Sequence, residues 1–207
     1  MPLVYFFGPD GSGKSSIARA LVEVLRARGT RVRLSWMRGT HICASLLARV
    51  LGHFSVFKGE DNPNYMITIP PKMRRLWQLV EVASMLPVLV ARYSLPSFIG
   101  YTVVGERYIP DFIVWVTLTT RDAHFQESLS AKFLLALSLK TQNRTYVTAA
   151  HSRLLERRRD SNPAFLMRQL QLYGKLARAI GAQTLDTTYR TIEESTQLLL
   201  KFINQET

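Results

Sequence analysis

The sequence predicts an α/β domain in which a parallel sheet of five strands is covered by helices on both faces. Short apolar runs typical of buried strands alternate with longer segments whose apolar residues recur at helical spacing. The first apolar run, Leu3–Phe7, leads through a glycine-rich loop into such a helix. Ligands of parallel sheets bind beyond the carboxyl ends of the strands. We expect residues 1–207 to form one domain.

The first half of the chain shows the predicted alternation of strands and helices. Ser15–Arg28 has helical periodicity and is followed by a glycine at the expected end of the helix. Arg31–Trp36 alternates and is predicted to be the second strand, and His41–Leu51 a helix. Lys58–Pro71 is rich in glycine, asparagine and proline and is predicted to be a loop, whereas Met73–Tyr93 is a long apolar helix.

The second half continues the alternation. The Asn162-Pro163 pair is typical of a helix start, and Thr191 with Glu194 forms a capping box before the last helix. The remaining predicted strands are Tyr101–Val104, Thr145–Ala149 and Gln183–Leu185, and the remaining predicted helices are Pro110–Thr117, Phe125–Leu139 and Pro163–Ile180.

Composition and charge limit the class of protein. Hydrophobic residues make up 47% of the chain and charged residues 20%, as in soluble globular proteins. A single cysteine, Cys43, cannot form an internal disulfide, and the N-terminus lacks the basic region of a signal peptide. Leu76–Leu95 contains Glu81, Pro87 and Arg92, so we predict a buried helix there and not a membrane span. We expect a cytoplasmic protein without a membrane partner.

The net charge of +12, carried more by arginine than by lysine, indicates an attraction to polyanions or a generally basic surface. Arginine binds phosphate through a planar fork, which favours phosphate-rich small molecules as ligands. The sequence contains no long basic tail and no recognised nucleic-acid motif, so we expect no nucleic-acid partner.

The loop after the first strand carries the most specific motif. Gly8–Ser15 fits G-x-x-x-x-G-K-[ST], in which backbone N–H groups and the helix N-terminus cradle phosphate oxygens. Lys14 is expected to reach the β and γ phosphates of ATP, and the Ser15 hydroxyl to bind Mg²⁺. The fold class is therefore refined to a P-loop NTPase three-layer sandwich. The predicted ATP-binding residues are Gly8, Asp10, Gly11, Ser12, Gly13, Lys14, Ser15 and Ser16.

Over nearly its whole length the chain resembles the thymidylate kinase family, especially the thymidylate-kinase-like branch of P-loop nucleoside monophosphate kinases. Phe6–Ser16 resembles the family's F-E-G-x-D-G-x-G-K-S-T, and Val103–Tyr108 resembles V-V-x-D-R-Y. Ser152–Asp160 resembles its arginine-bearing lid, which we place at about residues 151–162. Tyr173–Ala177 and Leu185–Thr187 resemble its Y-x-x-L-A and I-D-T segments.

The chain departs from the family mainly where the acceptor is recognised. Phe7 and Glu106 stand where the family has Glu and Asp, and Met37–Thr40 replaces R-E-P-G-G-T. Asp111 stands where thymidylate kinases tend to carry Ser, and Trp115–Val116 replaces a Tyr-Gln pair. The phosphate-binding segments match the family, so the resemblance implies ATP chemistry more strongly than it implies the acceptor.

An acidic and a basic residue follow the third strand of the expected sheet. Glu106 closes an apolar run, where an acid can hold Mg²⁺ through water or can pair with Arg107 as a surface residue. The resemblance implies that Arg107 binds the acceptor phosphate; a structural salt bridge is the alternative. Arg38, Tyr108 and Asp111 complete the acceptor site that we predict.

Asp10 lies within the phosphate loop, where a carboxylate is costly unless it serves a hydroxyl. The resemblance implies that Asp10 accepts a bond from the sugar 3′-hydroxyl, and a turn-forming role is the alternative. A run of arginines in the lid segment is either a solvated face or a source of positive charge for the migrating phosphoryl group. We count Arg153 and Arg157 of this run, with Lys14 and Arg107, as the predicted catalytic residues.

The favoured function is ATP-dependent phosphorylation of a nucleoside monophosphate, first of all dTMP to dTDP. One alternative is a kinase of a deoxynucleoside or another small-molecule hydroxyl, which needs a carboxylate base such as Asp10 or Asp111. A second alternative is a P-loop ATPase switch linked to nucleic acid. The expected cofactors are ATP and Mg²⁺ and the expected partner is a small nucleotide acceptor. The apolar Met73–Tyr93 helix offers a surface for a homodimer.

Overall fold

The computed structural model describes residues 3–37, 39–141, 143–158 and 162–205. Arg38 and Arg159, which the sequence placed in the acceptor site and the lid, lie outside the described residues. The strands are β1 (Leu3–Phe7), β2 (Val32–Ser35), β3 (Lys58–Asn62), β4 (Thr102–Gly105), β5 (Arg144–Thr148) and β6 (Gln183–Asp186). The helices are α1 (Lys14–Ala27), α2 (Ile42–Leu51), α3 (Arg74–Leu89), α4 (Leu95–Phe98), α5 (Ile109–Thr119), α6 (Leu129–Ser138), α7 (His151–Arg157), α8 (Pro163–Ala179) and α9 (Ile192–Gln205).

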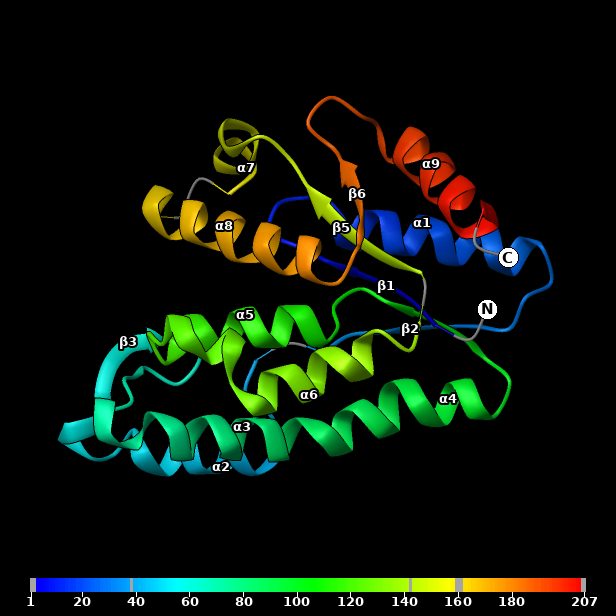
Figure 1. Ribbon diagram of the computed structural model, residues 1–207. Coiled ribbons are helices and arrows are strands. Elements are labelled where there is room, and N and C mark those ends of the chain that lie inside the picture. The colour runs from blue at the N-terminus through cyan, green and yellow to red at the C-terminus, as the bar shows by residue number, and fades with distance from the viewer. Residues whose placement is uncertain (1–2, 38, 142, 159–161, 206–207) are drawn as a thin grey trace.

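Five strands form a parallel sheet, as the sequence predicted, and the structure gives their order as β2-β4-β1-β5-β6 (Figure 1). In the central strand β1, Tyr5 lies opposite Gly105 of β4 and Arg144 of β5. Because the strands are parallel, all their carboxyl ends reach the same edge of the sheet. The loops after β1, β4, β5 and β6 therefore meet there.

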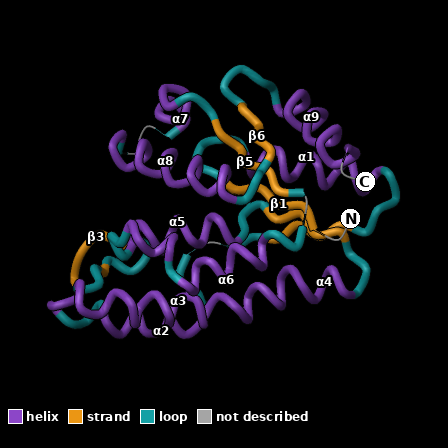
Figure 2. Tube along the Cα trace, viewed as in Figure 1, coloured by secondary structure: helices purple, strands orange, loops and turns teal. Residues whose placement is uncertain are grey.

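Helices cover the sheet on both faces, and each face has its own apolar core (Figure 2). Side chains alternate along β1, so that Val4 and Phe6 pack with α1 and α9, whereas Tyr5 and Phe7 pack with α3, α5, α6 and α8. All four of these side chains have no solvent exposure. This double burial explains why the sequence of β1 is continuously apolar.

The segment predicted as a loop over Lys58–Pro71 contains the strand β3, so that prediction was wrong in part. Ile67 makes antiparallel bridges to Lys58 and Asn62 across a tight turn. Ile67 and Ile69 are buried against Ala48 of α2 and Trp77 of α3, which anchors the segment to the helices. This strand lies outside the main sheet and forms one wall of a cavity described below.

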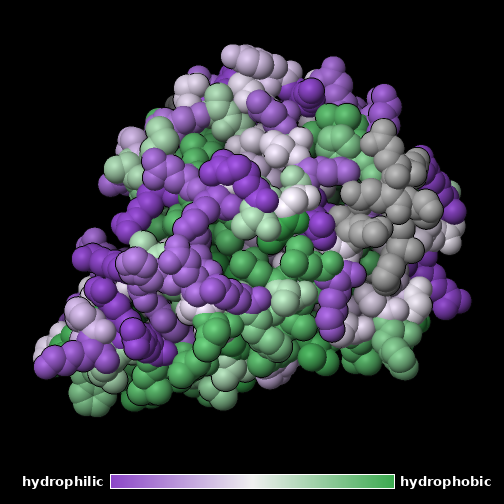
Figure 3. Space-filling view, in the orientation of Figure 1, coloured by the Kyte–Doolittle hydropathy of each residue, from purple (hydrophilic) through white to green (hydrophobic). Residues whose placement is uncertain are grey.

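The long apolar helix was predicted to be buried, and the structure corrects this. Pro71–Phe98 is long and apolar enough to cross a membrane, a test that core helices of soluble proteins also pass, and 39% of its most apolar window is buried. Met85 is fully buried, whereas Leu76 and Leu79 are 60% and 58% exposed. Figure 3 shows apolar side chains gathered along the edge of the molecule where Figure 1 places α2, α3 and α4.

Helix ends follow the expected chemistry where a cap is present. The Thr191 hydroxyl accepts from the backbone N–H of Glu194 at 3.1 Å, and the Glu194 carboxylate accepts from the N–H of Thr191 at 2.9 Å, which confirms the capping box. The helix predicted from Phe125 begins later, because Ala123–Glu127 forms a 3₁₀ turn and Ser128 caps α6.

Candidate functional site

The loop between β1 and α1 has a backbone that requires glycine. A Cβ atom on Gly8 would lie 2.1 Å from the carbonyl oxygen of Val147 in β5. Gly11 and Gly13 both have φ of +87°, in the left-handed region that other residues rarely adopt. No side chain caps the N-terminus of α1, so its backbone N–H groups face the loop. This is the strand–loop–helix arrangement that the motif requires.

Lys14 is buried within this loop. Its Nζ donates hydrogen bonds to the carbonyl oxygens of Gly8 at 2.7 Å and Pro9 at 2.5 Å and to Ser12 Oγ at 3.2 Å. These contacts hold the ammonium group at the first turn of α1, where the positive end of the helix also lies. The Lys14 ammonium group and the N-terminus of α1 therefore both place positive charge in the same part of the loop.

Ser15 and Glu106 meet although they come from different strand ends. Ser15 Oγ donates a hydrogen bond of 2.5 Å to Glu106 Oε1 just beyond β4. A hydroxyl and a carboxylate this close are oxygen ligands of the kind that Mg²⁺ prefers, with water and phosphate completing the shell. Among the residues that the structure describes, no group of three histidine, cysteine or acidic side chains could hold a metal ion.

Arg107 lies between two carboxylates. It forms ion pairs with Asp10 and, at 3.2 Å, with Asp111, which also accepts a bond of 2.9 Å from the hydroxyl of Tyr173. Burial alone would lower the pKa of Arg107, but Asp111 and Asp10 raise it overall, so the guanidinium stays charged. Burial raises the pKa of Asp111, and the charge of Arg107 opposes this rise. Asp111 thus fixes the position of Arg107.

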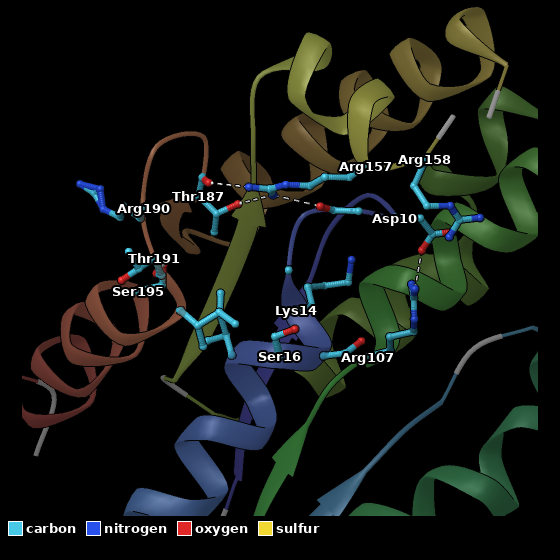
Figure 4. A pocket seen from close by; sticks show the side chains of 15 residues that line it. Asp10, Lys14, Ser16, Arg107, Arg157, Arg158, Thr187, Arg190, Thr191 and Ser195 are labelled. Atoms are coloured by element: carbon cyan, nitrogen blue, oxygen red, sulfur yellow. Dashed lines mark hydrogen bonds and ion pairs between the residues drawn. The ribbon is translucent and has the colours of Figure 1, made fainter. Parts of the chain in front are cut away.

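A cavity of about 470 Å³ opens beside the loop (Figure 4). Its walls come from the phosphate loop, Arg107, the end of α7, the loop after β6 and the first turn of α9. The basic side chains on its walls are Lys14, Arg107, Arg157, Arg158 and Arg190, and the acidic one is Asp10. This excess of positive charge favours a polyanionic ligand such as a triphosphate. We call it the donor cavity.

Arg157 connects the arginine-rich segment to the loop. Its guanidinium donates to the carbonyl oxygens of Gly11 and Thr187, both at 3.1 Å, and Thr187 Oγ1 donates to the carbonyl of Ser12 at 2.9 Å. Gly11 lies so close to α7 that a Cβ there would be 3.1 Å from the Arg158 side chain. The described part of the predicted lid therefore rests on the phosphate loop.

Arg153 has a different environment from Arg157. It pairs with Glu156 at 2.9 Å, and its guanidinium lies over the ring of Tyr189 at 5.9 Å. Arg153 does not line the donor cavity, so of the predicted catalytic residues the structure brings together Lys14, Arg107 and Arg157. Tyr108 also lies away from the cavities, because its ring packs against Tyr5 and Tyr93 at centroid distances of 4.6 and 4.9 Å.

A second cavity of about 820 Å³ adjoins the first, and Asp10 and Arg158 line both. We call it the acceptor cavity. Its walls come from β3, α5 and α8, and its aromatic side chains are Trp115, Phe165 and Tyr173. Four carboxylates line it: Asp10, Glu60, Asp61 and Asp111.

The sequence did not single out Glu60, Asp61 or Arg190 as site residues. The first two lie on β3, which was predicted to be a loop, and Asp61 is paired with Arg121 at 2.5 Å. Arg190 follows a strand end, which is the one signal that could have pointed to it. A scan against protein-family models finds no match for the chain, and a search of curated proteins finds none either.

Proposed function

We propose that this protein is a P-loop phosphotransferase that uses ATP with Mg²⁺ to phosphorylate a nucleoside monophosphate, first of all dTMP to dTDP. The observation that carries the proposal is the 2.5 Å contact between Ser15 and Glu106 beside the buried Lys14. These groups lie at the carboxyl edge of a parallel sheet, where two adjacent cavities meet.

The donor cavity suits the triphosphate of ATP. Lys14, Arg157 and the N-terminus of α1 supply positive charge where phosphate oxygens would lie. Ser15 and Glu106 would hold Mg²⁺, which neutralises and orients the phosphates when it is bound. Phosphoryl transfer depends mainly on such positioning and charge. The contacts of Lys14 and Thr187 with the loop hold it in the conformation that would supply both.

The acceptor cavity is large enough for a nucleotide, since small-molecule pockets span about 300–1,000 Å³. Trp115 and Phe165 provide aromatic surface for a base. Arg107 lines the donor cavity and pairs with Asp10 and Asp111, which line the acceptor cavity. The phosphate of a monophosphate is already anionic near neutral pH, so this reaction needs no strong general base. Arg107 would orient that phosphate toward the γ-phosphate.

A hydroxyl kinase is a second candidate, and the position of Asp10 favours it. Asp10 lines both cavities, so its carboxylate is placed to accept the proton of a hydroxyl that attacks the γ-phosphate. Arg107 is also already paired with Asp10 and Asp111, which leaves less charge free for an acceptor phosphate. A deoxynucleoside is the first acceptor to test under this reading.

The test is transfer of labelled phosphate from γ-labelled ATP to thymidylate, thymidine and the other nucleoside monophosphates. Labelled dTDP with unlabelled thymidine supports the leading proposal. Labelled thymidine with unreacted thymidylate replaces it by the hydroxyl kinase. ATP hydrolysis that DNA or RNA stimulates in a salt-sensitive way, without any labelled acceptor, supports a nucleic-acid-linked ATPase instead.

We also propose a homodimer through the outer face of α2 and α3. Leu46 and Val50 of α2 and Leu76 and Leu79 of α3 are all more than half exposed. Monomeric proteins rarely expose contiguous apolar patches larger than a few hundred Å². The continuous Pro71–Phe98 helical stretch is about 40 Å long at 1.5 Å per residue, which gives room for a standard interface.

A further inference from the structure

The side chain of Glu81 in α3 is a buried carboxyl group on the inner face of the helix. Glu81 has no solvent exposure, and its Oε1 accepts a hydrogen bond of 2.7 Å from Thr40 Oγ1. Within the described part of the chain, Oε2 has no hydrogen-bond partner. Burying a charged carboxylate without a partner is costly, so the uncharged form is favoured in this position.

Glu81 belongs to a chain of hydrogen bonds that joins three segments. Thr40, in the connection between β2 and α2, donates to Glu81 and accepts a bond of 3.0 Å from Asn62 Nδ2 at the end of β3. One turn further along α3, Ser84 Oγ accepts from the backbone N–H of Ala44 at 2.9 Å. The inner face of α3 thus holds both the β2–α2 connection and β3.

One of the two segments held in this way, β3 with the following Pro63, forms a wall of the acceptor cavity, and the β2–α2 connection lies behind it. Asn62 lies between Asp61 and Pro63, which both line that cavity. Gly39, just before Thr40, has φ of +90°, and a Cβ there would be 3.6 Å from Asn64 and 3.8 Å from the ring of Trp115. Trp115 is another lining residue. The Glu81 network therefore lies directly behind the wall.

We propose that Glu81 is a positioning residue whose neutral carboxyl group fixes the β2–α2 connection and β3 against the acceptor cavity, and whose ionisation loosens them. The proposal rests on the proposed function for the identity of that cavity. An ionised Glu81 needs hydration or a counter-charge, so we expect its ionisation to displace its partner Thr40 and, through Thr40, Asn62. Acceptor binding then weakens, whereas the donor cavity, built by other elements, keeps its shape.

The ionisation falls near neutral pH. Burial raises the pKa of Glu81 from 4.5 to about 7, and contacts with Thr40 and Trp77 oppose the rise. Among the described residues of the elements packed against it, the other charged or titratable groups are His41, Cys43 and Arg49 at and in α2, Lys58, Glu60 and Asp61 of β3, and Lys72, Arg74, Arg75, Arg92 and Tyr93 of its own helical stretch. Burial, and then Arg92, lower the pKa of His41, which separates its titration from that of Glu81.

The first test needs no ligand. Backbone hydrogen exchange of residues 37–44 and 58–64 is compared at pH 6 and pH 8 after correction for the intrinsic exchange rate. We expect protection to fall at pH 8 in the native protein and to stay constant in Glu81→Gln, which cannot ionise. Glu127→Gln, the same change at an exposed carboxylate paired with Lys175, should behave as the native protein. Equal pH dependence in the native protein and Glu81→Gln would overturn the proposal.

The second test uses kinetics. The KM for the acceptor should rise up to about tenfold between pH 6 and pH 8, with the KM for ATP little changed, and Glu81→Gln should remove the rise. A rise that persists in Glu81→Gln contradicts the proposal. If no acceptor reacts, the proposed function fails, but the exchange experiment still decides the role of Glu81. If Glu81→Gln does not fold, Thr40→Val tests the same link, because it should reduce protection of both segments at either pH.

Discussion

Ser15 and Glu106 lie 91 positions apart in the sequence, yet a hydrogen bond of 2.5 Å joins their side chains. The contact exists because β1 and β4 are neighbours and parallel, so the residues after them leave the sheet side by side. The same geometry would bring the hydroxyl and the carboxylate to one magnesium ion.

Glu106→Gln should therefore weaken the dependence on magnesium. We expect the Mg²⁺ concentration for half-maximal transfer to rise about 10- to 100-fold, since an amide is a poorer partner for the ion and its waters. The measurement is a magnesium titration of phosphoryl transfer, with Glu127→Gln as the control. An unchanged titration curve would remove Glu106 from the metal site.

Lys14→Ala should abolish phosphoryl transfer while the fold persists. The ammonium group donates to Gly8, Pro9 and Ser12 of the loop, and Lys14 belongs to neither apolar core, so its loss leaves both cores intact. Transfer activity and the circular dichroism melting curve are measured on the same sample. A folded Lys14→Ala protein with full activity would refute the phosphotransferase assignment.

The loss of transfer caused by Arg107→Ala relative to Asp10→Asn should differ between a monophosphate acceptor and a hydroxyl acceptor. For a monophosphate acceptor, Arg107→Ala should lower transfer on the order of a hundredfold, and Asp10→Asn should cost less because its amide oxygen still accepts a bond. For a hydroxyl acceptor, Asp10→Asn should be the more harmful change. The turnover of both variants with thymidylate and with thymidine gives the ranking.

Arg107→Ala should also destabilise the protein, because Asp111 would remain buried without its counter-charge. The loss is expected to be about 3 kcal/mol. Arg107→Lys, which retains a positive charge, separates this effect from catalysis. A denaturant melt in which Arg107→Ala is as stable as the native protein would show that Asp111 is neutral in the fold.

The stability of the protein should depend on pH through Glu81. Because the folded pKa is about 7 and the unfolded pKa 4.5, the folded state binds more protons between these values. The free energy of unfolding should therefore fall as the pH rises from 4.5 to 7, by up to about 3 kcal/mol. The free energy of unfolding is measured by denaturant melts of the native protein and of Glu81→Gln across this pH range. The same pH dependence in both proteins would show that Glu81 is not the group responsible.

The homodimer predicts a concentration-dependent sedimentation coefficient. Leu76→Glu combined with Leu79→Glu places charges on the exposed face of α3 and should yield monomers. Tyr189→Glu changes a side chain that is 88% exposed on the loop after β6 and should leave the assembly unchanged. Monomers of the native protein at every concentration would contradict the proposal.

The sequence was sufficient to predict the parallel sheet and the glycine-rich turn between β1 and α1 because both signals are local. Apolar runs mark β1 and β4, and the glycine pattern fixes the turn at Gly8–Ser15. It could not predict β3, since Lys58–Asn62 is polar, lacks alternation and forms its β-bridges to Ile67 of the same segment. The carboxylates of β3 were missed for this reason.

The features that the sequence could not predict depend on tertiary packing. Leu79 and Met85 are both apolar, but Leu79 is exposed and Met85 is buried, so composition alone could not show that α3 has an exposed face. The pairing of Arg107 with Asp10 likewise depends on the contact between the loops after β1 and β4. The sequence therefore predicted Arg107 and Asp10 as site residues but not the ion pair between them.

The shared wall of the two cavities carries a thermodynamic consequence. Asp10 and Arg158 border both cavities, so a ligand that reorients either side chain from one cavity alters the binding surface of the other. Any factor by which a ligand in one cavity changes the affinity of the other cavity must then equal the factor in the reverse direction. If the proposed function holds, ATP and the acceptor change each other's affinity by the same factor.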